Sequence, residues 1–315
     1  MRDTARQFLD QSGWRDPNVT PVAGDLSARH YFRVSTAGRT AILMDAGNDE
    51  TSTRAFQKIT DWLLNIGLSA PHIYAAQPEN GLLLLEDFGT TPARQMLAND
   101  AASSEIYDAS IRVLLDIRNA APPALTCPDA GALCDWTRLA DDFYPSANPA
   151  ALDTIRAELE TVLADCLTAR PSLSLRDFHV DNMMWLPERT GPQRLGLLDY
   201  QDAFLTHPVY DLVSLLTDAR TLVPPPLREK LIKSYAQASR DDHRQLSRAF
   251  AAFSVQRNLR ILGIFHRAAK VDGKTHHLPK VPRVYGYLSE AMEHPVFDGV
   301  RPLLSLALPA PEIAP

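Results

Sequence analysis

Two carboxylates and one amide are spaced so that they could serve a single phosphate-transfer reaction. Four residues separate Asp177 from Asn182, and Asp199 ends a short apolar segment seventeen residues after Asn182. A loop that turns back between Asp177 and Asn182 can aim both side chains at one point, and a hairpin can return Asp199 to it. Phosphoryl transfer depends on positioning and charge neutralisation, and Mg²⁺ takes few protein oxygens besides phosphate oxygens and water. The spacing predicts that Asp177 accepts the hydrogen bond of an attacking hydroxyl while Asn182 and Asp199 hold Mg²⁺.

The elements that must position these residues begin with a small sheet. Residues 28–35 and 40–45 have the composition and alternation of two strands in a hairpin. Apolar residues recur at helical spacing over 56–66, and Gly67 suits the end of that helix. The apolar run 81–85 predicts a buried strand. The first part of the chain is therefore predicted to be a small sheet with one helix.

The remainder of the chain predicts helices on both sides of a second hairpin. The hairpin has short strands at 183–186 and 195–200, with a Gly-Pro turn between them. Helices are predicted over 106–117, 149–166, 208–220, 226–238 and 244–270. The Pro-rich segment from Pro302 onward is predicted to be irregular.

Composition limits the possible partners and the compartment. The 315 residues carry a net charge of −6 with 45% hydrophobic residues, as expected for a folded globular protein. The acidic balance argues against a nucleic-acid partner. No apolar run is long enough for a transmembrane helix, and the first twelve residues lack the order of a secretory signal. We therefore expect a cytoplasmic protein with no membrane partner.

The run from Asp177 to Leu212 resembles the aminoglycoside phosphotransferase and choline kinase superfamily. Those enzymes carry His-Gly-Asp-x-x-x-x-Asn, then Ile-Asp-Trp, then Asp-Pro-x-Tyr-Asp-Leu. The matching runs here are Leu175-Arg176-Asp177 through Asn182, Leu198-Asp199-Tyr200, and His207-Pro208-Val209-Tyr210-Asp211-Leu212. The resemblance implies that Asp177 is the general base, that Asn182 and Asp199 bind the metal, and that Asp211 is a structural brace for the catalytic loop.

The resemblance also implies an α+β, protein-kinase-like fold with two lobes. Residues 1–88 would form the antiparallel-sheet lobe that covers the nucleotide. Residues 89–315 would form a larger, mainly helical lobe with the catalytic loop and the substrate pocket. ATP and Mg²⁺ are the cofactors that such a fold implies.

Candidate nucleotide-binding residues lie in the first lobe. The superfamily has a phosphate-binding lysine near the position of Leu43-Met44-Asp45, and no lysine is found there. Arg29 or Arg33 could supply the missing cation. The backbone at Glu86 and Phe88 is a candidate hinge that would hydrogen-bond the adenine. The remaining candidates lie in a predicted phosphate-covering loop: Gly24, Ser27 and Ala28.

A closer resemblance covers nearly the whole chain. It rests on five blocks: Gly24–Val34, Ile42–Ala46, Leu84–Gly89, Leu175–Met183 and Gln256–Phe265. These blocks resemble the anomeric kinases of cell-wall recycling, which phosphorylate N-acetylmuramate and N-acetylglucosamine at the C1 hydroxyl. The resemblance implies a sugar 1-phosphate as product, on the way to a UDP-sugar in peptidoglycan recycling.

Four residues are candidates for contact with the sugar: Arg176, His179, Arg257 and Arg260. Arg257 and Arg260 adjoin apolar residues in a predicted helix, which suggests partial burial. Guanidinium groups pair well with carboxylates. We therefore expect Arg257, or its neighbour Arg260, to pair with the lactyl carboxylate of N-acetylmuramate.

Two alternatives remain open at the level of sequence. The chain could be another kinase of the same superfamily, acting on choline, homoserine or an antibiotic. It could also be a nucleotide-binding regulatory module without catalysis. The missing strand lysine favours the second alternative, whereas the presence of Asp177, Asn182 and Asp199 opposes it.

Overall fold

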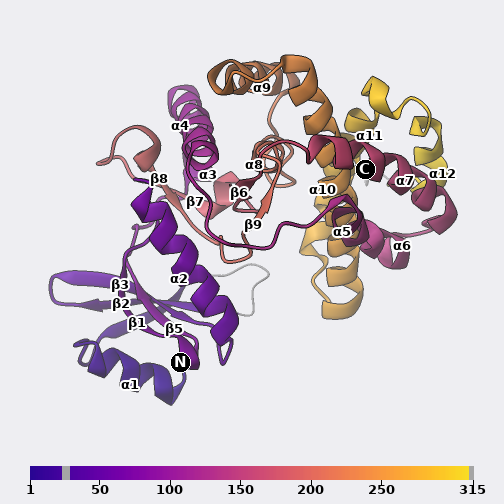
Figure 1. The fold of residues 1–315 in the computed structure, drawn as a ribbon. Helices are drawn as coiled ribbons and strands as arrows, with labels where there is room; N and C mark the ends of the chain where they lie inside the picture. The colour runs from indigo at the N-terminus through magenta and orange to yellow at the C-terminus, as the bar shows by residue number, and fades with distance from the viewer. Residues whose placement is uncertain (23–28, 312–315) are drawn as a thin grey trace. The chain divides into compact units, whose positions relative to one another are not determined.

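The chain packs into two compact units (Figure 1). The computed structural model describes residues 1–22 and 29–311. The first unit comprises Met1–Asp116 and Val180–Ala203, and the second comprises Ile117–His179 and Phe204–Pro315. The predicted 183–200 hairpin thus packs with the N-terminal sheet rather than with the residues that flank it in sequence. The predicted lobe boundary after residue 88 stays a prediction. No helix of the described segments combines the length and apolar character needed to cross a membrane.

The first unit is built on a five-stranded antiparallel sheet in the order β1-β2-β3-β5-β4. Its strands are β1 (Asn18–Val22), β2 (His30–Thr36), β3 (Arg39–Asp45), β4 (Ile73–Gln77) and β5 (Leu82–Leu85). The predicted β2–β3 hairpin is confirmed, with Val34 opposite Ala41. The two outer strands β1 and β4 were not predicted, because they lie at the sheet edges and their mostly exposed or half-buried residues lack an apolar face.

Two helices pack with this sheet, where one was predicted. Helix α1 (Asp3–Gln11) buries Phe8 and Leu9 in a cluster with Trp14 and with sheet residues including Leu43. Helix α2 (Glu50–Asn65) runs over the sheet in Figure 1. All four residues of β5 are buried, so the centre of the sheet is covered on both faces.

The rest of the first unit carries the second hairpin. Strands β7 (Met183–Trp185) and β8 (Leu195–Leu197) are antiparallel, as predicted. Around them lie α3 (Ala93–Met96), η3 (Val180–Asn182), η4 (Gly191–Arg194) and α4 (Asp100–Asn119), whose last three residues belong to the second unit. The Leu197 amide donates to the Ser69 carbonyl oxygen at 2.8 Å, which attaches the hairpin to the loop after α2.

The second unit is helical apart from the short β6–β9 pair. Its central element is α10 (His243–Asp272), which contacts α6, α7, α8, α9 and α11. The elements before it are α5 (Ala130–Asp135), η2 (Trp136–Arg138), α6 (Leu139–Phe143), α7 (Pro149–Cys166), β6 (Ser172–Ser174), β9 (Phe204–Thr206), α8 (Tyr210–Leu216) and α9 (Pro225–Ser239). Those after it are η5 (Thr275–Lys280), α11 (Val281–Met292), η6 (Pro295–Phe297), η7 (Arg301–Leu303) and α12 (Leu304–Ala307).

The segment from Pro302 onward was predicted to be irregular, and this prediction was wrong over η7 and α12. Leu304 and Ala307 are buried, and α12 contacts α7. Packing of these apolar residues stabilises a short helix that its Pro-rich flanks did not indicate. The predicted cap of α7 is confirmed, because the Asn148 side chain accepts a hydrogen bond from the Ala151 amide at 3.2 Å.

Candidate active site

The β7–β8 hairpin brings the two predicted metal ligands to one end of the first unit. Met183 is opposite Leu197, and the Leu198 amide donates to the Asn182 carbonyl oxygen at 3.0 Å. Asp199 comes next, with a φ of 59°. Non-glycine residues rarely adopt this left-handed conformation, and it occurs preferentially at functional sites. The hairpin thus holds Asn182 and Asp199 close together at the end of its two strands.

A guanidinium group faces the Asp199 carboxylate. Arg29 Nη1 lies 3.5 Å from Asp199 Oδ1, and the Arg29 side chain is 12% exposed. Arg29 also hydrogen-bonds to Ser52 Oγ near the start of α2. The Met44 side chain, near the expected position of the superfamily's lysine, is fully buried. Of the two arginines predicted to replace that lysine, Arg29 is thus the one beside a predicted metal ligand.

Arg33 is engaged elsewhere in the first unit. It donates to both carboxylate oxygens of Asp87 at 2.7 and 2.9 Å, and to the Gly89 carbonyl oxygen at 2.7 Å. Burial opposes ionisation of Asp87, but the bonds from Arg33 and Gly89 outweigh it and lower the pKa of the carboxyl. Arg33 therefore ties β2 to the segment after β5. Its contact with a nucleotide stays a prediction.

The candidate hinge is fixed by two further contacts. Arg189 Nη2 pairs with Glu86 Oε1 at 2.5 Å. The Phe88 ring lies against Gly196 in β8, where an added Cβ would come within 2.6 Å of the ring. The side chains of Glu86 and Phe88 thus attach the segment to the second hairpin. Hydrogen bonds from its backbone to adenine remain a prediction, as do the roles of Gly24, Ser27 and Ala28, which lie outside the described residues.

In the second unit, Asp211 holds the loop that precedes Asp177. Its carboxylate accepts hydrogen bonds from Ser174 Oγ at 2.8 Å, from the Leu175 amide at 2.6 Å and from the Arg176 amide at 3.1 Å. Burial raises the pKa of Asp211 to about 6 in spite of these donors. These contacts hold the loop before Asp177, and the role of Asp211 as a brace of the catalytic loop stays a prediction.

Arg176 has an unusual backbone conformation. Its φ is 72°, in the region that favours glycine, and the resembled superfamily has glycine at this position. Asp211 accepts a bond from the Arg176 amide, and Arg257 Nη1 donates to the Arg176 carbonyl oxygen at 2.9 Å. The surrounding structure therefore holds both backbone groups of a strained residue.

The predicted base, Asp177, lies beside Arg257. Arg257 Nη2 is 3.3 Å from Asp177 Oδ1; the Arg257 side chain is 5% exposed and that of Asp177 is 39% exposed. Burial raises the pKa of the carboxyl, but the positive charge of Arg257 leads the opposing effects, with smaller ones from His179, Arg260 and Arg176. The net result is a pKa of about 2. Asp177 is therefore ionised at neutral pH and can accept a hydrogen bond from a hydroxyl.

The other predicted sugar contacts lie nearby in the same unit. The His179 ring is 3% exposed, and its Nε2 is 3.1 Å from Arg220 Nη1. Burial is the main cause of a lowered pKa for His179, so the ring is neutral at physiological pH. The Arg260 guanidinium lies 5.5 Å from the centre of the Trp136 ring, and that of Arg176 lies 5.7 Å from it.

The metal-binding role of Asn182 and Asp199 stays a prediction, and the two side chains offer oxygen donors. Asn182 and Asp199 offer an amide and a carboxylate, and the Asp199 side chain remains 43% exposed. Within the described residues, no group of three or more His, Cys, Asp and Glu side chains could hold a metal. Two oxygen donors suit Mg²⁺ that arrives with phosphates and keeps water ligands.

Several residues of this region were not predicted. Trp136, Arg189 and Arg220 contact predicted site residues that lie between 40 and 124 positions away. No local motif marks them, because their roles depend on packing between distant segments.

Comparison with known proteins identifies the family of this chain. The model of the phosphotransferase enzyme family APH matches residues 18–248. A protein of Caulobacter vibrioides named N-acetylmuramate/N-acetylglucosamine kinase is 30% identical over 91% of each chain. A Pseudomonas putida protein of the same name is 30% identical over 87% of this chain and 84% of that protein.

A solved structure shows the same fold. The choline kinase LicA of Streptococcus pneumoniae gives a TM-score of 0.66 over 92% of this chain and 100% of that chain, at 16% identity. The predicted protein-kinase-like α+β fold, with an antiparallel sheet and a mainly helical remainder, is confirmed. The family match over most of the chain and the two relatives lead to one conclusion: this chain belongs to the APH phosphotransferase family, and it is an enzyme that transfers phosphoryl groups.

Proposed function

We propose that this protein uses Mg-ATP to phosphorylate the C1 hydroxyl of N-acetylmuramate and N-acetylglucosamine, as in peptidoglycan recycling. The observation that supports the chemistry most strongly is Asp177, an ionised carboxylate on a loop held by Asp211 and Arg257. The assignment of the sugars is supported by the relatives, whose names state both substrates.

In the proposed reaction, Asp177 accepts a hydrogen bond from the anomeric hydroxyl and orients its oxygen toward the γ-phosphorus of ATP. The new bond forms between the sugar oxygen and this phosphorus, while the bond from phosphorus to the β,γ-bridging oxygen breaks and ADP leaves. The hydroxyl proton passes to Asp177. A carboxylate with a pKa near 2 is a weak base, so proton transfer follows bond formation, as suits a loose phosphoryl transition state.

The nucleotide would be held by residues of the first unit. Mg²⁺, when bound by Asn182 and Asp199, would neutralise charge on the phosphates. Arg29, which lies beside Asp199, would supply the fixed cation that the missing lysine provides elsewhere in the superfamily. The cytoplasmic location stays a prediction.

Phosphorus NMR provides the test. The protein is incubated with Mg-ATP and each sugar, and in parallel with choline, homoserine and an aminoglycoside. The proposal predicts a new sugar 1-phosphate signal coupled to the anomeric proton, together with ADP. Product from another acceptor alone would identify a different kinase. ATP binding without transfer to any acceptor would favour the regulatory module.

A further inference from the structure

Three guanidinium groups act on the carboxylate of Asp177, while the nearby Asp211 carboxylate bonds to the backbone of the same loop and interacts with Arg257. Arg176, Arg257 and Arg260 all lower the pKa of this carboxyl. Arg257 is engaged with it directly, because its two terminal nitrogens bond to the Arg176 carbonyl oxygen and to Asp177. Arg260 differs from Arg257: the described residues offer its guanidinium no hydrogen-bond or ion-pair partner.

Burial makes the position of Arg260 costly. The residue is 8% exposed, and burial together with the charges of Arg176 and Arg257 lowers its pKa, although Tyr210 and the charge of Asp177 oppose this shift. A buried cation without a direct ion-pair partner is unfavourable. Some side-chain nitrogens and oxygens of the described segments are fully buried without a partner, and the Arg260 nitrogens are not among them. A ligand can therefore reach these nitrogens. Asp177 offsets part of this cost without pairing directly with Arg260, so the Arg260 guanidinium can still pair with the anion of a ligand.

Arg176 and Arg260 share one aromatic surface. Their guanidinium carbons lie 5.7 and 5.5 Å from the centre of the Trp136 ring, within the range of cation–π attraction. Arg176 adopts its left-handed conformation where glycine would have no steric strain. Its side chain therefore offers something that glycine cannot, and the guanidinium on Trp136 is the evident candidate.

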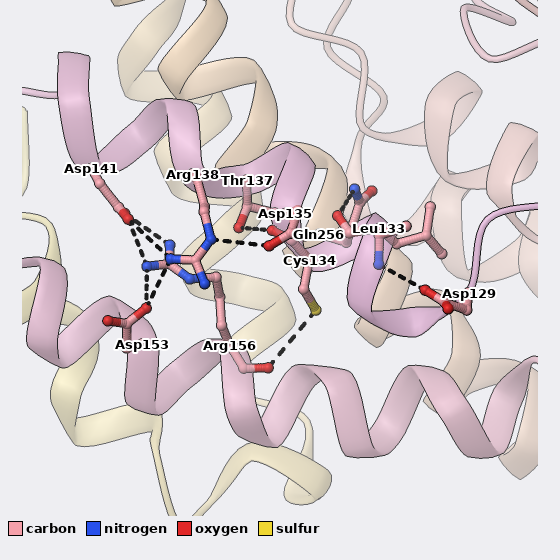
Figure 2. A network of polar contacts seen from close by, with 11 residues as sticks. Asp129, Leu133, Cys134, Asp135, Thr137, Arg138, Asp141, Asp153, Arg156 and Gln256 are labelled. Atoms are coloured by element: carbon pink, nitrogen blue, oxygen red, sulfur yellow. Dashed lines mark hydrogen bonds and ion pairs between the residues drawn. The ribbon is translucent and has the colours of Figure 1, made fainter.

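The segment that presents Trp136 is firmly held (Figure 2). Thr137 Oγ1 donates to the Cys134 carbonyl oxygen at 2.6 Å. Gln256, one residue before Arg257 in α10, donates to the Leu133 carbonyl oxygen at 2.8 Å. On α6, which follows Trp136 and η2, Asp141 accepts two hydrogen bonds from a buried arginine of α7, as Figure 2 also shows. A rigid aromatic plane with two cations is suited to bind a planar anion.

We propose that Arg176, Trp136 and Arg260 form a carboxylate-binding platform that recognises an acidic sugar. This inference rests on the proposed function and refines it. The platform would bind the lactyl carboxylate of N-acetylmuramate, which N-acetylglucosamine lacks. Arg257, the first candidate from sequence, instead pairs with Asp177.

The test compares three acceptors: N-acetylmuramate, its methyl ester and N-acetylglucosamine. ADP release gives kcat/KM for each with the wild-type protein and with Arg260→Gln. The wild-type protein should prefer the acid over the ester by about tenfold or more, as expected for a charge-assisted contact. Arg260→Gln should lose most of this preference. The control is Arg267→Gln on the same helix, whose side chain is 48% exposed and which should keep the wild-type ratio.

Other results would overturn the platform. One is an acid-to-ester ratio of kcat/KM that Arg260→Gln leaves unchanged. Another is an increase in KM for ATP in Arg260→Gln that is the same with every acceptor, because it would place Arg260 at the nucleotide. Thermal unfolding checks that the variant is folded. Should it not fold, Arg176→Gly is the second variant; it removes a guanidinium and relieves the backbone, and it should also lose the preference.

The proposed function can be wrong even if the carboxylate-binding platform is correct. If the wild-type protein forms no sugar phosphate, that function is excluded, and calorimetric titration still tests the platform. Tighter binding of the acid than of the ester, with the difference lost in Arg260→Gln, would support it. Equal binding of both compounds by the wild-type protein would exclude it.

Discussion

Asp177 is ionised because of its neighbours, and its ionisation makes the stability and the activity of the protein depend on pH. Its pKa is depressed, so its ionised form stabilises the folded state above the ordinary value near 4, and this contribution is lost as the pH falls toward 2. Burial alone would raise the pKa. The positive charge of Arg257 is the first of the effects that reverse the direction.

Replacement of Arg257 by Gln should therefore shift the acidic limb of the pH–activity profile. Without this charge, burial raises the pKa of Asp177, and protonated Asp177 cannot accept the hydroxyl hydrogen bond. The decline in kcat/KM on acidification should begin at a higher pH than in the wild-type protein, measured between about pH 5 and 8. The profile of Arg267→Gln should match the wild type. An unshifted limb in Arg257→Gln would contradict the role given to this pair.

The position of Arg29 beside Asp199 leads to a second prediction. If it supplies the phosphate-binding cation, Arg29→Met should raise KM for ATP by about tenfold or more, the size of a charge-assisted contact. Arg29→Lys should recover part of the loss, because the charge is kept while the fork geometry is lost. Equal kinetics of both variants and the wild type would remove Arg29 from the nucleotide site.

Among the elements, helix α10 carries Arg257 and Arg260, and its packing on α6 sets their position relative to Trp136. Gly263 permits this close approach, because a Cβ there would lie 2.5 Å from the Leu139 carbonyl carbon and 2.6 Å from the Ala140 nitrogen. Backbone atoms cannot move aside as flexible side chains do. The approach of the two helices thus depends on the absence of a side chain at Gly263.

Gly263→Ala should lower the free energy of unfolding by about 1–3 kcal/mol, as expected for overpacking. Gly286→Ala in α11 is the matched control, since nothing lies within 4 Å of its added Cβ. That variant should be neutral or more stable, because alanine favours helix. Urea unfolding of both variants measures the difference, and equal stability would show that α10 and α6 can separate without cost.

The elements also show what sequence could and could not predict. The β2–β3 and β7–β8 hairpins were predictable because alternation and short apolar runs are local signals. Asp177, Asn182 and Asp199 were singled out by their spacing, by the hairpin that follows Asn182 and by the family resemblance. The edge strands β1 and β4 had little apolar pattern to reveal them, and α12 depends on packing with α7. Trp136 became a candidate only when folding placed Arg176 and Arg260 over its ring.

For the whole molecule, nucleotide binding should be coupled to stability. A ligand that binds only the folded state stabilises it by an amount that grows with concentration, about 2.7 kcal/mol at one hundred times Kd. Mg-ATP should therefore raise Tm. Removal of Mg²⁺ with EDTA, or the substitution Asp199→Asn, should reduce the shift strongly. A full shift without the metal would show that binding does not depend on Asp199.

The most direct test of the account is the position of the metal. A crystal grown with Mn²⁺ in place of Mg²⁺ and a non-hydrolysable ATP analogue gives an anomalous signal for the ion. We expect one peak in contact with side-chain oxygens of both Asn182 and Asp199 and with the phosphates. A metal–nucleotide complex bound away from these two residues would contradict the account.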